Sequence, residues 1–224
     1  METEKKVDLA AVQENSQVKT LILKADDNLG TLGYTEHGFR HCRLTGRAAK
    51  RVILELGGEP REAELAGIAG YLHDIGNVMG RREHDVAGAV MALRILQDMG
   101  MPLDEAADIA AAIGNHDEEE GRVVNRITAA LILADKSDVH RSRVRNRDKS
   151  TFDIHDRVNY AVEESRLNVD SDKKSITLTI RIDTGISQVM EYFEIFLTRM
   201  VMCRRAAAFL DARFALIINE VDLL

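Results

Sequence analysis

The chain has 224 residues, of which 45% are hydrophobic and 30% charged, so it can bury the core of one full-sized domain with an appendage. Its formal net charge of −7 argues against a general nucleic-acid binder or a protein that coats anionic membranes. The sequence contains no apolar run long enough for a membrane-spanning helix and no apolar stretch typical of a secretory signal. Its two cysteines are too few for a disulfide framework. We therefore expect a cytoplasmic protein.

Apolar residues at helical spacing dominate the chain before about residue 140. Pro60 opens one of these segments, and apolar residues surround most of that helix, so we expect it to be buried. Glycines follow several of the segments and predict their ends. The expected helices cover residues 8–28 (as one or two short helices), 44–56, 60–72, about 84–99, about 103–113 and about 122–138.

The pattern changes after about residue 170. Residues 175–182 alternate strictly between apolar and polar, which is typical of a half-buried strand. Residues 186–210 return to helical spacing, and Phe214, Leu216 and Ile218 then alternate as a second strand. Because two strands alone are not stable, this β-α-β unit must pack on the helical domain, on a further strand or on a second subunit.

We therefore divide the chain into three parts. Residues 1–30 form an N-terminal helical segment, 31–165 the main helical domain, and 166–224 the C-terminal strand-helix-strand unit. The exposed strand edges of the last unit suggest a homodimer formed through it.

Histidines and aspartates stand where the expected helices begin or end. Such ends converge readily on a shared cleft in a bundle, where metal sites are built from facing helices. Imidazoles and carboxylates together suit iron, manganese, zinc or another divalent transition metal. The positions are His41, His73 with Asp74, His84, His116 and Asp135.

The order of these residues resembles the HD-domain superfamily of metal-dependent phosphohydrolases, in its two-metal form. The likeness covers roughly residues 35–145, and the segments GYLHDIGN and ILADKSD carry it most clearly. It implies a mainly α chain, an HD-domain helical bundle, to which the small C-terminal β-α-β unit is added. It also implies a divalent transition metal, as two ions of iron, manganese or another element.

The resemblance assigns a role to each of these residues. Asp74 would bridge two ions, and His73 and Asp74 would also be the catalytic residues. If His84 and His116 are instead surface histidines, the centre holds a single ion. The implied ligands are His41, His73, Asp74 and Asp135 for the first ion, and Asp74, His84 and His116 for the second.

Many relatives carry lysine or arginine at the position of Asn77, where it often contacts phosphate, so that charge must come from elsewhere in this chain. Arginine suits bidentate contact with phosphate. The ordinary alternative for the arginines after residue 140 is a solvated surface, and for His37 it is a histidine at the start of a helix. The candidate substrate-binding residues are Lys136, Arg141, Arg143, Arg81 and His37.

The leading functional hypothesis is an enzyme that cleaves a phosphate ester or anhydride of a small, nucleotide-like substrate with a metal-activated water. Two alternatives remain open at this point. Some two-metal HD proteins resemble this ligand set but use a di-iron pair with oxygen to cleave carbon bonds. A non-catalytic sensor that holds a metal and binds a nucleotide is the other alternative.

Overall fold

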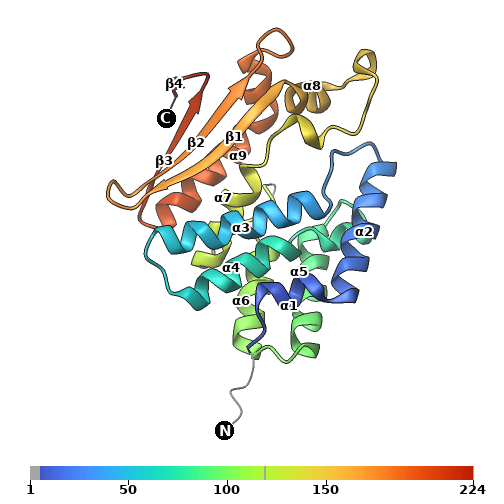
Figure 1. Cartoon of the computed structure of the whole chain (residues 1–224), viewed down its shortest axis with the longest axis vertical. Coiled ribbons are helices and arrows are strands. Elements are labelled where there is room, and N and C mark those ends of the chain that lie inside the picture. The colour runs from blue at the N-terminus through green and yellow to red at the C-terminus, as the bar shows by residue number, and fades with distance from the viewer. Residues whose placement is uncertain (1–5, 119, 224) are drawn as a thin grey trace.

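A computed structural model describes residues 6–118 and 120–223 of the chain. Its helical body carries a small sheet at one end (Figure 1). Among the described residues, no helix combines the length and the apolar character needed to cross a membrane. The helices of the body are α1 (Leu9–Glu14), α2 (Ser16–Thr31), α3 (Phe39–Glu55), α4 (Pro60–Leu72), η1 (Ile75–Val78), α5 (His84–Asp98), α6 (Leu103–Ile113), α7 (Arg126–Lys136), η2 (Arg141–Arg143), η3 (Lys149–Thr151) and α8 (Ile154–Ala161).

The α4 helix forms the centre of this body. It is buried on nearly every face, as its apolar composition predicts, and it packs against α1, α3, α6 and α7. The last expected helix, about 122–138, is shorter in the structure. Asn125 caps the N-terminus of α7 by accepting a 2.7 Å hydrogen bond from the Thr128 backbone N–H, so the helix starts at Arg126.

Glycines let the elements of the site approach closely. A Cβ atom on Gly46 of α3 would lie 2.8 Å from the Gly67 carbonyl oxygen of α4, and one on Gly70 would lie 2.9 Å from the Thr45 carbonyl oxygen. A Cβ atom on Gly76 would lie only 1.9 Å from the His84 carbonyl oxygen. Larger residues would therefore separate α3 from α4, and η1 from the start of α5.

The C-terminal unit contains the β-α-β crossover expected from the sequence. Strands β2 (Ser175–Ile182) and β3 (Arg213–Ile218) pair in parallel and are joined by α9 (Val189–Phe209), which packs on α7 of the helical body. The prediction of a mainly helical chain with a small C-terminal β-α-β unit is confirmed.

Two further strands complete the sheet, whose order is β1-β2-β3-β4. Strand β1 (Val162–Asp170) pairs antiparallel with β2, and the short β4 (Val221–Asp222) pairs antiparallel with β3. Strand β1 starts before the predicted boundary at residue 166. The expected two-strand unit thus packs on a further strand and on the helical body, while the homodimer stays a prediction.

Candidate metal centre

The six predicted metal ligands come from five elements and meet in one place. His41 lies in the first turn of α3, His73 and Asp74 follow α4, His84 opens α5, His116 follows α6, and Asp135 is in the last turn of α7. Their ligand atoms form three groups, within each of which all atoms lie within 4.8 Å of one another. The groups are His41 with His73 and Asp74, His73 with His116 and Asp135, and Asp74 with His84 and His116.

The histidines direct their Nε2 atoms toward this centre. Nδ1 of His73 lies 2.9 Å from the Gly70 carbonyl oxygen, and Nδ1 of His116 lies 2.6 Å from that of Ile113. Nδ1 of His84 likewise lies 3.0 Å from the Arg81 carbonyl oxygen. Because a carbonyl oxygen only accepts, each Nδ1 carries a proton, which leaves Nε2 as the ring atom that can bind a metal.

Asp74 is placed to bridge two ions. Its Oδ2 atom is buried, accepts no hydrogen bond from any residue that the structure describes, and lies 3.2 Å from His73 Nε2 and 3.5 Å from His41 Nε2. Its Oδ1 atom faces the other group, 3.6 Å from His84 Nε2, and accepts a 2.8 Å hydrogen bond from Asn77 Nδ2. A buried carboxylate oxygen without a donor is costly unless a cation binds it. The residues therefore fit a divalent metal, and their donor set of imidazole and carboxylate suits a transition metal.

The electrostatics of the cluster favour anionic carboxylates. Burial would raise the pKa of Asp74, but the neighbouring His73 outweighs it and holds that pKa well below its usual range. Burial would lower the pKa of His73, yet Asp74 and Asp135 raise it to about 10. Burial, together with the charge of His73, holds the pKa of His116 well below its usual value. The cluster thus offers both anionic oxygens and a neutral imidazole.

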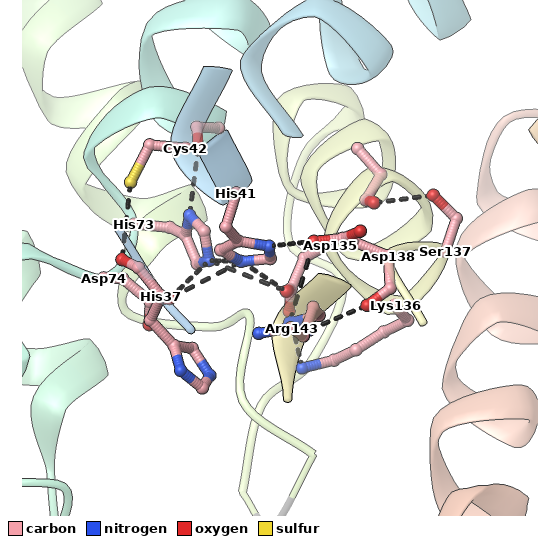
Figure 2. Close-up of polar contacts among 12 residues, drawn as sticks. His37, His41, Cys42, His73, Asp74, Asp135, Lys136, Ser137, Asp138 and Arg143 are labelled. Atoms are coloured by element: carbon pink, nitrogen blue, oxygen red, sulfur yellow. Dashed lines mark hydrogen bonds and ion pairs between the residues drawn. The ribbon is translucent and has the colours of Figure 1, made fainter. Parts of the chain in front are cut away.

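Asp138 is a part of this centre that sequence reasoning missed. Its Oδ2 lies 2.7 Å from His41 Nδ1 and accepts a 2.7 Å hydrogen bond from Arg40 Nη2. Figure 2 shows His41 between the His73–Asp74 pair and Asp138. Burial would raise the pKa of Asp138, but Arg143 and His41 hold it far below its usual range. Asp138 therefore fixes the orientation of the His41 ring.

A chain of ion pairs leads from the centre to the C-terminal unit. Lys136 is 3% exposed, and its Nζ lies 2.8 Å from Asp135 Oδ2 and 2.6 Å from Glu118 Oε2. Glu118 in turn accepts a 2.9 Å hydrogen bond from Arg199 Nε of α9. Arg199 was not among the predicted site residues, because the sequence of residues 186–210 indicates only helical spacing.

The candidate substrate-binding residues lie in different surroundings. Arg81 Nη1 is 3.2 Å from His84 Nε2 and 3.8 Å from Asp74 Oδ1, and the His37 ring is 5.6 Å from the His41 ring. Arg141 instead pairs with Glu163 at 3.3 Å and lies over the Tyr160 ring. Lys136 is engaged by the carboxylates described above. Arg141 therefore lies away from the six ligands, whereas Arg81 and His37 lie beside them.

Replacing His116 with alanine is expected to lower the number of bound ions by about one per chain, because His116 belongs to the group that would hold the second ion. Elemental analysis of the purified variant beside the native protein measures this count. An unchanged count would reduce the centre to a single ion.

Known proteins resemble this chain. The HD domain family matches residues 38–149, half of the chain. An uncharacterised protein of Methanocaldococcus jannaschii is 26% identical over 204 residues, which cover 80% of this chain and 78% of the relative. A solved structure, described as a predicted HD superfamily hydrolase from an uncultured Thermotogales bacterium, aligns with a TM-score of 0.44 and 20% identity over 60% of this chain and 75% of its own. The family match, with the motif residues gathered at one centre, shows that the chain belongs to the HD-domain family.

Proposed function

We propose that this protein is a metal-dependent phosphohydrolase that cleaves a phosphate ester or anhydride of a small, nucleotide-like compound. The observation that carries the proposal is a cavity of about 300 Å³ beside the predicted ligands, lined by His37 and three arginines, Arg81, Arg143 and Arg199. Arginines from three separate segments converge on this cavity, and guanidinium groups match the oxygens of a phosphate. The volume lies at the small end of the range for small-molecule sites.

The same cavity offers contacts for the rest of a nucleotide. Tyr34 and Phe196 line it and supply aromatic surface for a base, while Asp156 and Asn159 supply hydrogen-bonding groups. Phe196 also lies under the Arg199 guanidinium, whose carbon is 4.7 Å from the ring centroid, so the aromatic and cationic contacts are adjacent.

Divalent ions bound at the centre would lower the pKa of water and neutralise phosphate oxygens. The chain's own residues bind and orient the substrate. The Nη1 atom of Arg81 lies 3.2 Å from the predicted ligand atom His84 Nε2 and 3.5 Å from Asn77 Oδ1, so Arg81 can supply the positive charge that Asn77 lacks. Arg143 is held by the carbonyl oxygens of Asp138 and Glu36, which fixes its guanidinium at the cavity wall.

A metal analysis followed by a phosphate-release screen tests the proposal. The purified protein is analysed for its metals and then assayed with the metal found, on nucleotides, dinucleoside polyphosphates and cyclic nucleotides. We expect release of phosphate or a nucleotide product from one of these classes. Oxygen consumption with iron and no hydrolysis would support the oxygenase alternative instead. Binding without turnover across the whole panel would support a sensor.

Arg199 contributes to substrate binding from the C-terminal unit, and replacing it with alanine is expected to raise KM about tenfold with a smaller change in kcat. The fold should persist because Glu118 keeps its ion pair with Lys136. Steady-state kinetics measure the effect. Arg94→Ala, which removes an exposed arginine from α5, is the matched control. A native KM in the Arg199 variant would contradict a role in binding.

A further inference from the structure

A second groove, of about 600 Å³, lies between α3 and β1. One wall is a single face of α3, which presents Arg40, Leu44, Arg47 and Arg51 at helical spacing. The opposite wall is the segment 165–168 of β1, and Figure 1 shows α3 passing beneath the sheet at this side. The groove therefore forms only where the helical body meets the C-terminal unit.

The lining of the groove is strongly basic. The described residues that line it include four arginines, namely Arg40, Arg47, Arg51 and Arg166, but a single carboxylate, that of Asp138. The Asp138 carboxylate is 3% exposed and is already bound by Arg40 and His41, so it presents little negative charge to the groove. Positive charge therefore exceeds negative charge among the lining side chains, although Glu36, Glu55 and Glu164 beside the lining pair with Arg40, Arg51 and Arg166.

The arginines keep donors free for a ligand. Arg47 makes no hydrogen bond or ion pair within the part of the chain that the structure describes. Arg51 donates to the Leu167 carbonyl oxygen, and its Nε is 3.8 Å from Glu55 Oε2, beyond hydrogen-bond distance. Arg166 pairs with Glu164, but its side chain is 70% exposed. A guanidinium has five N–H donors, so each of these three can still bind an oxyanion.

The chemistry of the lining defines the ligand. Guanidinium groups on both walls fit a compound with two or three linked phosphates, because linked phosphates offer oxygens to more than one guanidinium group. Leu44, Ala48 and Leu167 provide an apolar floor for a base or another flat group. We propose that this groove binds a small soluble polyphosphate compound, such as a nucleoside triphosphate, at a site separate from the substrate cavity.

The separation from the substrate cavity is geometric. In the described part of the chain, no residue lines both the groove and the substrate cavity. The Nε2 atom of His41 faces the metal ligands, whereas its Nδ1 atom faces Asp138, which lines the groove. The groove thus lies behind the His41 ring. Asp138 is hydrogen-bonded to both Arg40 and His41, so a compound that binds Arg40 would be connected to His41 through this one residue.

Calorimetric titration of the full chain with hydrolysis-resistant probes tests this inference. The probes are the β,γ-methylene analogues of ATP and GTP, with methylenediphosphonate as the probe that lacks a base. We expect the Arg47→Ala/Arg166→Ala double variant to weaken one binding event about a hundredfold, at roughly tenfold for each arginine. Arg199→Ala should leave that event unchanged. The Arg94→Ala/Arg205→Ala double variant has the same net charge and serves as the control.

The outcomes separate the groove from the substrate cavity. Binding that depends on Arg47 and Arg166 but not on Arg199 supports the groove, whether or not the protein hydrolyses phosphates. Binding that is lost only in Arg199→Ala, or no binding of any probe to the native protein, overturns the inference. Circular dichroism of the double variant confirms its fold, which two exposed substitutions should preserve.

Discussion

Replacing His73 with alanine, or Asp74 with asparagine, is expected to remove bound metal and lower phosphohydrolase activity by at least about a thousandfold. His73 belongs to two of the three ligand groups, and the two carboxylate oxygens of Asp74 face different groups. Either change therefore affects both predicted ion sites. Activity assays and elemental analysis of the purified variants measure the two effects.

The variants should still fold, since helix α4 is held by apolar contacts on nearly all faces rather than by its C-terminal histidine. Far-ultraviolet circular dichroism checks this point. Asp98→Asn, which changes an exposed carboxylate paired with Arg94, is the control for Asp74→Asn. Full turnover in either the His73 or the Asp74 variant would refute the assignment of the centre.

The gathering of the six predicted ligands could be anticipated because each stands at a helix end that the sequence marks. His73 follows the last apolar turn of α4, and Asp135 closes the apolar α7. When helices of that length pack as a bundle, their ends lie close to one another, so residues at those ends can meet in one site. The metal ions that these ligands would hold stay a prediction. That prediction depends on the family resemblance, which the spacing of the motif residues indicates.

Residues that act across long distances in the chain could not be anticipated in this way. Arg199 reaches the cavity because α9 packs on α7, and no local sequence pattern predicts the contact between these two helices. Strand β1 was missed because Leu167 and Val162 are its only buried hydrophobic residues and a register shift follows Val162. The alternation that revealed β2 is therefore not present in β1.

Asp138 shows the same limit at the centre itself. In the sequence it is one more polar residue after a helix, and only the folded chain brings it to His41 of α3. A carboxylate that accepts the Nδ1 proton of a ligating histidine fixes the ring and increases its basicity, so that its loss typically weakens metal binding about 10–100-fold. Asp138 also binds the guanidinium of Arg40 and lies 3.7 Å from that of Arg143.

Asp138→Asn is accordingly expected to lower metal affinity about 10–100-fold while leaving the six ligands in place. Activity measured against metal concentration should shift to higher concentrations and recover at saturation, whereas Asp74→Asn should not recover at any concentration. The variant should also lose about 3 kcal/mol of unfolding free energy, because Arg143 loses an anionic partner in a buried position. Denaturant unfolding measures that loss. If the variant were destabilised but bound metal as tightly as the native protein, Asp138 would support the fold and not the orientation of His41.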